Sequence, residues 1–213
     1  MLNFRSIQPF GALWMLAAAL VLTANAWAQE EAADAFVKRM STEVLDVIKA
    51  DKSMRSGDIA KVVALVDTRI MPHVDFQRMT ASAVGPGWRQ ATPEQQKRLQ
   101  DEFKILLVRT YSGALSQISD QVISIKPLRA GPEDKEVVVR SEVRGSGDPI
   151  QLDYRLEKAP GQGAGWRIFN INVMGVWLVE TYKSQFAQEI NAKGVDGLIE
   201  SLAARNKSNA KKP

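Results

Sequence analysis

The fold of this chain is decided by one segment, Thr92-Pro93-Glu94-Gln95-Gln96-Lys97-Arg98-Leu99-Gln100-Asp101-Glu102-Phe103-Lys104-Ile105-Leu106-Leu107-Val108-Arg109-Thr110-Tyr111. It opens with a capping box, in which Thr92 and Gln95 satisfy each other's backbone N–H groups and Pro93 takes the first helical position. Apolar side chains then recur at helical spacing, which predicts a helix of about 25 residues that forms the spine of the fold. Its broad apolar face comprises Leu99, Phe103, Leu106, Leu107, Thr110, Tyr111, Ala114, Leu115 and Ile118.

The sequence before this helix predicts two shorter helices and a proline-started turn. Residues 34–49 carry one apolar stripe at spacings of three and four. A second helix follows a cap at Ser56 or Asp58, and Pro72 begins a further helical turn. Residues 85–87, Gly-Pro-Gly, then break the chain.

After the long helix the apolar period changes to two, which indicates strands. Alternation runs through residues 122–125, 137–143, 150–157 and 166–173, and short loops join these runs. Four consecutive strands predict a curved antiparallel meander with one apolar face. Helical periodicity then returns and is interrupted at Gly194. We therefore predict an α+β domain in which a four-stranded antiparallel sheet is covered by N- and C-terminal helices.

The two ends of the chain carry different signals. Residues 1–28 combine Arg5, an apolar run and the sequence Ala26-Trp27-Ala28, which predicts a secretory signal cleaved after Ala28. An uncleaved membrane anchor is the alternative, but the apolar run is shorter than the roughly 20 residues that a spanning helix needs. We expect a single domain over residues 29–205 and a basic, flexible tail over 206–213. The sequence contains no cysteine, so disulfides and thiolate chemistry are excluded.

The distribution of charge argues against nucleic-acid binding. Without Arg5 the chain has 27 basic and 24 acidic residues. Four of the basic residues follow the last acidic residue, Glu200, and the remainder is nearly neutral, with 23 basic against 24 acidic residues. A nucleic-acid-binding protein needs a clustered basic face instead. The basic tail is a solvated end or, alternatively, a membrane tether.

Few residues have the pattern of catalytic chemistry. His73 is the single histidine and lies two residues before Asp75, which suggests either half of a metal site or a base with its orienting group. Asp75 also stands at the start of a helix, where a capping role is favoured. The glycine run over residues 161–165 precedes a strand and not a helix, so it predicts a hairpin loop and not a phosphate site.

Two distant segments resemble the MlaC family. The matching residues are Pro72, Asp75, Phe76 and Met79, the pair Trp88-Arg89, Tyr111, and then Gly175-Val176, Leu178-Val179, Tyr182 and Gln185-Phe186. Members of this family are periplasmic carriers that shuttle phospholipids between the two membranes of Gram-negative bacteria. The resemblance implies a fold similar to the cone of nuclear-transport-factor-like proteins, with an internal apolar pocket. Trp177 departs from the small residue common in the family, and it either narrows the pocket or lies outside it.

The resemblance also implies a function without catalytic residues, metals or cofactors. It implies a monomer that binds glycerophospholipid, exchanges it with an outer-membrane lipoprotein–porin complex and an inner-membrane MCE-domain ABC transporter complex, and maintains outer-membrane lipid asymmetry. Inward-facing side chains would bind the acyl chains, although without the resemblance they describe a dry core. These candidates are Phe76, Met79, Leu106, Tyr111, Val137, Val139, Leu152, Tyr154, Phe169, Ile171, Val173, Val176 and Leu178.

Two other functions remain open from the sequence. The first is an exported cone-fold enzyme that uses His73 or an internal carboxylate. The strand acids Glu142, Asp153 and Glu157 alternate with apolar residues, so we expect them to point away from the apolar face. The second is a purely structural partner of an envelope complex, suggested by the basic tail.

Overall fold

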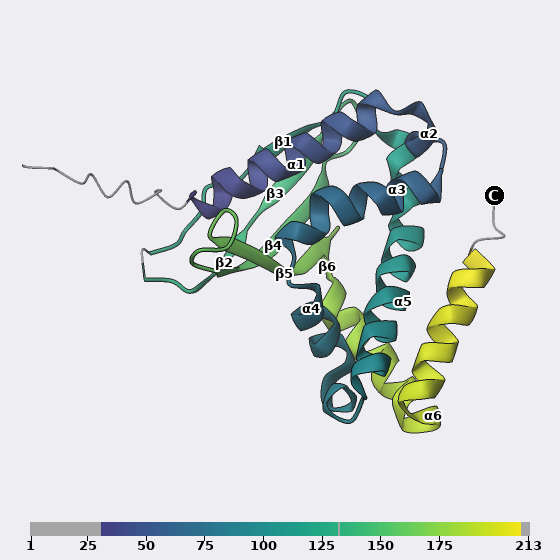
Figure 1. Ribbon diagram of the computed structural model, residues 1–213. Coiled ribbons are helices and arrows are strands. Elements are labelled where there is room, and N and C mark those ends of the chain that lie inside the picture. Colours follow the sequence, from purple (N-terminus) through teal and green to yellow (C-terminus); the bar gives the residue numbers. More distant parts are fainter. Residues whose placement is uncertain (1–30, 132, 210–213) are drawn as a thin grey trace, which may run out of the picture.

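The structure, a computed structural model, describes residues 31–131 and 133–209 (Figure 1), and the predicted signal segment 1–28 lies outside them. The N-terminal part is helical. Its elements are α1 (Ala33–Ala50), α2 (Lys52–Arg55), α3 (Ile59–Leu65), the π-helix η1 (Val66–Ile70), the 3₁₀ helix η2 (Met71–His73), α4 (Phe76–Val84), the 3₁₀ helix η3 (Gly85–Arg89), α5 (Pro93–Tyr111) and the 3₁₀ helix η4 (Ser112–Gln117). The C-terminal part comprises β1 (Val122–Ile125), β2 (Glu136–Val139), β3 (Ser141–Arg144), β4 (Ile150–Lys158), β5 (Trp166–Val173), β6 (Val176–Trp177) and α6 (Leu178–Asn209).

The helix starts follow local side-chain chemistry. The carboxylate of Asp58, one of the two predicted caps, accepts the Lys61 N–H at 3.2 Å, and that of Asp75 accepts the Arg78 N–H at 2.8 Å. Both bonds of the capping box between Thr92 and Gln95 are present. Such caps satisfy the N–H groups that a helix leaves unpaired in its first turn.

The spine helix is shorter than predicted. Helix α5 ends at Tyr111, after 19 residues, and the chain continues as the tighter helix η4. The apolar periodicity continues to Ile118, but Gly113 lowers the helical propensity directly after the end of α5. Periodicity therefore located the helix correctly and overestimated its length.

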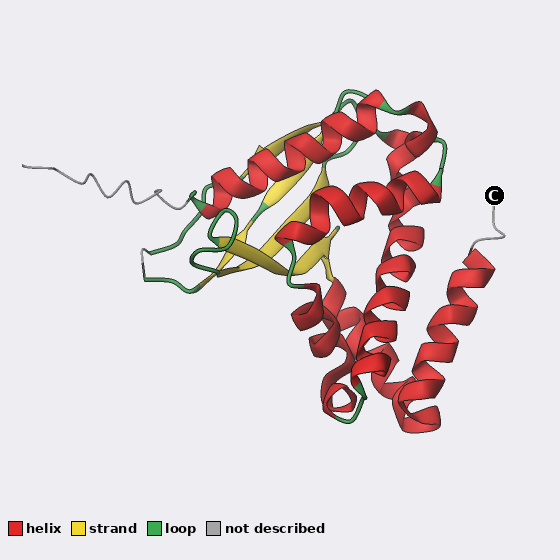
Figure 2. Ribbon diagram, in the orientation of Figure 1, coloured by secondary structure: helices red, strands yellow, loops and turns green. Residues whose placement is uncertain are grey.

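The sheet is the predicted antiparallel meander with a different strand count (Figure 2). The predicted strand 137–143 is divided at Arg140 into β2, which pairs with the second half of β4, and β3, which pairs with β1 and the first half of β4. The division coincides with a side-chain bond, because the Ser141 N–H donates to the carboxylate of Asp153 at 3.1 Å. The short strand β6 adds a sixth strand, at the edge of β5.

One face of the sheet is covered by helix α1. The side chains of Val137, Val139, Tyr154 and Leu156 on this face pack in one buried cluster with Phe36, Val37 and Met40 of α1. The hydroxyl groups of Ser41 and Tyr154 also lie within hydrogen-bond distance of each other, at 3.1 Å. Helices α1 and α3 lie on this side of the sheet in Figure 1, whereas α4, α5 and α6 extend beyond it.

A cluster of aromatic rings joins α4, α5 and α6. The Phe103 ring lies 5.7 Å from the Phe76 ring, 4.9 Å from the Tyr182 ring and 5.2 Å from the Phe186 ring, measured between centroids. All four side chains are buried. The Phe76 ring is stacked on Phe103 and the other two rings meet Phe103 edge to face, and both arrangements stabilise a core beyond their apolar area.

Helix α6 is bent back on itself at Gly194, as the sequence predicts. The backbone there has a φ of 69° and a ψ of −173°, which is not helical. The second arm continues to Asn209, past residue 206, where the sequence predicted the tail to begin. The Asn206 side chain is buried and donates to the carbonyl oxygen of Glu102 in α5 at 2.9 Å, which fixes this part of the helix.

Candidate functional site

The buried apolar residues form two clusters and not one contiguous core. The larger cluster lies between the sheet, α1, α4, α5 and α6, and it contains Met40 and Leu106. The smaller one consists of Ile48, Met54, Val62, Leu65 and Val108. One main core with a smaller satellite is the usual pattern for a domain. The boundary between the two clusters lies along the chain segments that contribute residues to both.

Three helical elements cross this boundary. Helix α1 passes from Met40 to Ile48, and α5 passes from Leu106 to Val108. The π-helix η1 connects Leu65, in the smaller cluster, with Ile70 and Met71, which pack against the larger one. Single π-turns inside helices occur frequently at functional sites.

We use the term seam for six half-buried apolar residues that pack against the larger cluster: Ile70, Leu107, Tyr111, Leu152, Ile171 and Val173. All six pack against the larger cluster and retain partial exposure. Three of them lie on helical elements and three on strands β4 and β5. The seam thus combines contact with the core and access from solvent.

The strand residues of the seam lie on the sheet face that α1 covers. Ile171 pairs with Tyr154, whose hydroxyl contacts Ser41, and Val173 pairs with Leu152. Paired residues of an antiparallel sheet share one face, so all four side chains point to the same side. Tyr154 is 4% exposed, and burial raises the pKa of its phenol to about 12. Its hydroxyl is therefore neutral at physiological pH and serves as a hydrogen-bonding group.

The helical side of the seam carries a second tyrosine. Burial and the nearby Tyr182 raise the pKa of Tyr111, so it too is neutral at physiological pH. Tyr111 ends α5, and Leu107 lies one helical turn before it. A phenol at the edge of an apolar surface offers a polar hydroxyl where that surface meets water.

The predicted lipid-binding residues fall into two groups, apart from Val176 and Phe169. Tyr111, Leu152, Ile171 and Val173 belong to the seam. A second group is packed within the larger cluster, so these side chains support the site from behind: Phe76, Met79, Leu106, Val137, Val139, Tyr154 and Leu178. Val176 pairs with Val173 but is 45% exposed.

Phe169 is the exception among the predicted inward residues. The register between β4 and β5 shifts next to Arg155 and Leu156, which leaves Phe169 without a partner on β4. Such a bulge re-aims side chains relative to simple alternation. The Arg78 guanidinium lies 3.7 Å from the centre of the Phe169 ring and also bonds with Glu157, which alternates with buried Leu156. Phe169 therefore lies outside both apolar clusters, beside Arg78.

Two seam residues, Ile70 and Leu107, are not among the predicted lipid-binding residues. Leu107 lies on the predicted apolar face of the long helix, and Ile70 directly precedes Met71 and Pro72. Periodicity assigns a residue to a buried face but does not distinguish full burial from half burial. Trp177, the predicted departure, is half-buried, and the Arg155 guanidinium lies 4.0 Å from the centre of its ring.

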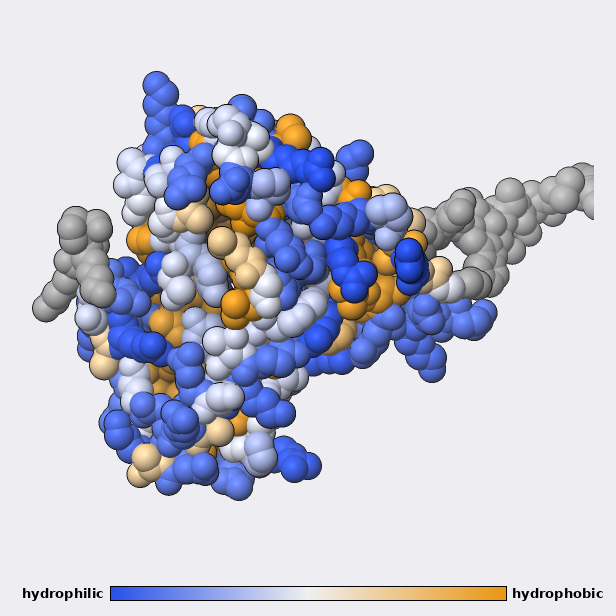
Figure 3. All heavy atoms as spheres, turned by 180° about the vertical axis from the view of Figure 1, so that it is seen from behind, coloured by the Kyte–Doolittle hydropathy of each residue, from blue (hydrophilic) through white to orange (hydrophobic). Residues whose placement is uncertain are grey.

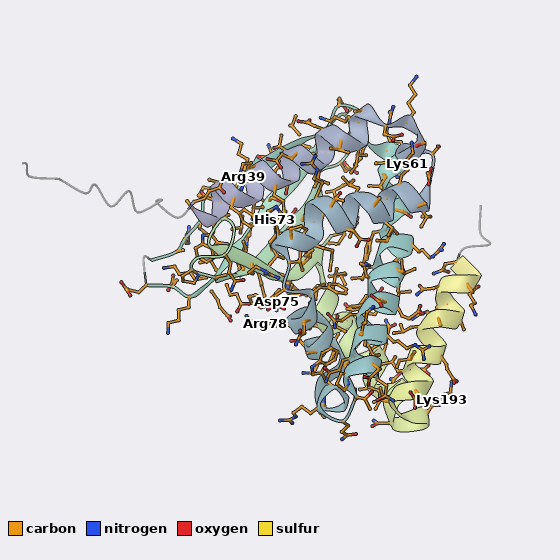
Figure 4. All side chains as sticks on the ribbon, viewed as in Figure 1. Arg39, Lys61, His73, Asp75, Arg78 and Lys193 are labelled. Atoms are coloured by element: carbon orange, nitrogen blue, oxygen red, sulfur yellow. The ribbon has the colours of Figure 1, made fainter. Side chains whose placement is uncertain are left out.

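His73 and Asp75 have separate structural roles in this arrangement (Figure 4). Asp75 caps α4, and the His73 ring packs edge-on against the Phe36 ring at 5.3 Å. Burial and the positive charge of Arg39 lower the pKa of His73. Within the part of the chain that the structure describes, no group of three or more His, Cys, Asp and Glu side chains could hold a metal ion. The three strand acids avoid the α1-covered face, and Asp153 is buried but bonded to Ser141 and Gln151.

Two hollows lie elsewhere on the surface. One, of about 620 Å³, is bordered mainly by polar residues such as Gln77, Gln100, Gln162 and Arg167. The other, of about 420 Å³, lies between α4, η3 and α6. The face opposite to that in Figure 1 is mostly hydrophilic, with scattered hydrophobic side chains (Figure 3). No helix among residues 31–131 and 133–209 has the length and apolar character to cross a membrane.

Comparison with known proteins gives consistent matches over most of the chain. The family model described as MlaC protein matches residues 38–204. The chain is 29% identical over 193 residues to the toluene tolerance protein ttg2D of Pseudomonas putida, an alignment that covers 90% of this chain and 86% of that protein. It is 21% identical over 168 residues to the intermembrane phospholipid transport system binding protein MlaC of Haemophilus influenzae, covering 78% of each.

A solved structure matches with higher identity. It is the phospholipid-binding protein from Ralstonia solanacearum in complex with a phospholipid, and it is 49% identical to this chain. The superposition has a TM-score of 0.80 and covers 85% of this chain and all of that one. At this level of identity the likeness extends beyond the fold.

Proposed function

This chain belongs to the MlaC family, and from that membership we propose that it is a periplasmic phospholipid carrier whose seam holds the acyl chains. The main support is the solved structure of a 49% identical protein in complex with a phospholipid. The seam supplies a surface suited to acyl chains, because its residues are apolar, contact the core and are only half-buried. The side chains packed behind it, from Phe76 to Leu178, would fix its shape.

An apolar site solves the problem of moving water-insoluble acyl chains through an aqueous compartment. Each methylene group of an acyl chain costs roughly 0.8 kcal/mol to expose to water, so a free diacyl lipid does not cross an aqueous compartment readily. A carrier must cover the chains and leave the charged headgroup wet. The phenol of Tyr111, half-buried at the end of α5, would offer one of the few polar groups that such an apolar site usually contains.

The proposal extends to export and partners. Residues 1–28 would direct secretion and be removed after Ala28, leaving a mature chain that begins at Gln29. The carrier would exchange glycerophospholipid with an outer-membrane lipoprotein–porin complex and an inner-membrane MCE-domain ABC transporter complex, and so maintain outer-membrane lipid asymmetry. The relatives support this through their names, which include an intermembrane phospholipid transport system. We propose no catalytic role, since Asp75 serves as a helix cap and His73 packs against Phe36.

Native mass spectrometry of the purified mature chain tests the proposal directly. We expect a complex heavier than the protein by the mass of one or more glycerophospholipids, released by organic extraction. Repeated isolation of lipid-free protein that also takes up no added phospholipid would refute the carrier function.

A matched pair of variants tests the position of the site. In Ile171→Trp the indole fills the seam, whereas in Val138→Trp it lies on the opposite face, where Val138 pairs with Arg155. If the indole displaces only two methylene groups of an acyl chain, lipid retention should fall about tenfold in Ile171→Trp. It should change little in Val138→Trp. Equal retention in the two variants would place the acyl chains elsewhere.

A further inference from the structure

The hollow of about 420 Å³ lies between α4, η3 and the first arm of α6, apart from the seam. Its volume is in the lower part of the range for small-molecule sites. It is bordered by Arg78, Ala81, Ser82, Gly85, Pro86, Trp88, Arg89 and Lys183. We call it the basic groove.

The charge of the basic groove is positive. Arg78, Arg89 and Lys183 border it, and no acidic residue does. Arg78 is paired with Glu136 and Glu157. Arg89 and Lys183 are exposed and have no carboxylate partner within residues 31–131 and 133–209. Two cations on different elements thus face one hollow without a counter-charge.

The rest of the groove combines an aromatic ring with small groups. Trp88 is half-buried against the larger cluster, and the Gln96 side-chain amide donates to its backbone carbonyl at 2.9 Å. Pro86 and Ala81 add apolar surface, and Ser82 contributes an exposed hydroxyl. A tryptophan beside unpaired lysine and arginine is the combination found where proteins contact the headgroup region of membranes.

We propose that the basic groove docks on an anionic membrane surface by binding the phosphate group of a phospholipid headgroup. Guanidinium and ammonium groups complement a phosphodiester, and the Ser82 hydroxyl can donate to one of its oxygens. The choice of a membrane phosphate over a free phosphate rests on the proposed function. We favour a membrane over an acidic protein segment because Trp88 and Pro86 add apolar surface beside the cations, as at membrane interfaces.

Vesicle co-sedimentation of the mature chain tests this docking. Wild-type protein should bind vesicles that contain phosphatidylglycerol more strongly than pure phosphatidylcholine vesicles, with binding weakened by salt. The double variant Arg89→Glu/Lys183→Glu removes two cations, each worth roughly one kilocalorie per mole near such a surface, so its affinity should fall at least about 30-fold. The control Arg129→Glu/Lys135→Glu makes the same charge change at two exposed residues in the loop before β2 and should retain most of the binding.

The remaining outcomes distinguish a membrane phosphate from a free phosphate, and a failure of docking from a failure of lipid carriage. Equal loss in both double variants, or no preference for anionic vesicles, would overturn the docking site. Saturation of the groove by inorganic phosphate or glycerol 3-phosphate, with no vesicle binding, would also overturn it, as would binding to an acidic peptide alone. The seam variant Ile171→Trp should dock normally, so loss of lipid cargo and loss of docking are distinguishable.

Discussion

The hydroxyl pair of Ser41 and Tyr154 links α1 to the centre of the sheet at the residue scale. Both side chains are buried, and the two oxygens lie 3.1 Å apart. A buried hydroxyl left without its partner costs about 1–3 kcal/mol, so Tyr154→Phe and Ser41→Ala should each destabilise the fold by about that amount. The double variant should lose less free energy of unfolding than the two single variants together, because it leaves no hydroxyl without its partner.

Urea unfolding of the four proteins measures this coupling. Additive losses would mean that the two hydroxyl groups do not interact in solution. Because Tyr154 has a pKa of about 12, the coupling should not change between about pH 6 and about pH 8.

His73 should make stability depend on pH. Its pKa is lowered in the folded protein from the ordinary value of 6.5, chiefly by burial and then by Arg39, whereas Glu43 acts in the opposite direction. The unfolded chain therefore binds a proton at His73 more readily than the folded one. Stability should be full above about pH 6.5 and fall as pH decreases towards the lowered pKa, below which this contribution no longer changes.

The measurement is the free energy of unfolding of wild type and His73→Gln between about pH 5 and about pH 8. The variant should lose part of the slope below about pH 6.5 and match the wild-type slope above about pH 7. An identical slope in both proteins would show that His73 has the same proton affinity folded and unfolded.

Single residues were predictable where their chemistry is local. Thr92 and Asp75 act as caps because a side chain and a backbone group a few residues away determine the bond. Phe169 was not predictable, because its direction depends on how β4 and β5 align across a bulge. Alternation along one strand contains no information about the register of its partner.

Gly194 determines the shape of α6 at the scale of the element. Its φ of 69° with a ψ of −173° belongs to a region that is essentially restricted to glycine, although an added Cβ would meet no atom within 4 Å. Gly194→Ala should therefore destabilise the fold through backbone strain alone, by about 1–3 kcal/mol.

Gly113→Ala is the matched control for this prediction. It also has free space around the added Cβ, but its φ is not in the left-handed region, so alanine should be neutral or slightly stabilising. Thermal and urea unfolding report both changes. If the two variants were equally stable, the bend would not be held by the conformation of Gly194.

Elements were predictable in kind and less so in extent. The long helix, the meander and the break at Gly194 follow from the period of the apolar residues. The division of one strand into β2 and β3 accompanies a bond between Ser141 and Asp153, twelve residues apart. The end of α5 likewise depends on packing and on Gly113, which periodicity does not describe.

Cargo should stabilise the molecule as a whole. A ligand that binds only the folded state at 100 times its dissociation constant adds about 2.7 kcal/mol. For a domain of this size, that corresponds to an increase in Tm of roughly 5–10 °C. Lipid-loaded protein should therefore melt above protein stripped by detergent exchange, and Ile171→Trp should show little difference between the two preparations. Equal melting temperatures of the wild-type preparations would contradict occupancy of the seam.

The overall architecture was predictable from the order of elements, because helices, meander and helices leave few ways to cover one sheet face. The seam was not. It consists of half-buried residues from η1, α5, β4 and β5, which only the folded chain brings to the same cluster. Several predicted pocket residues, such as Met79 and Leu106, are fully packed in the larger cluster.

The two clusters also differ in when their parts become available during synthesis. Every residue of the smaller cluster, with the side chains packed on it, lies between Val44 and Ile118. The larger cluster joins Ala33 to Leu202 and needs both arms of α6. Since a chain is made from its N-terminus, all residues of the smaller cluster have been synthesised before any strand of the sheet. The larger cluster, and with it the seam, can form completely only after nearly the whole chain has been made.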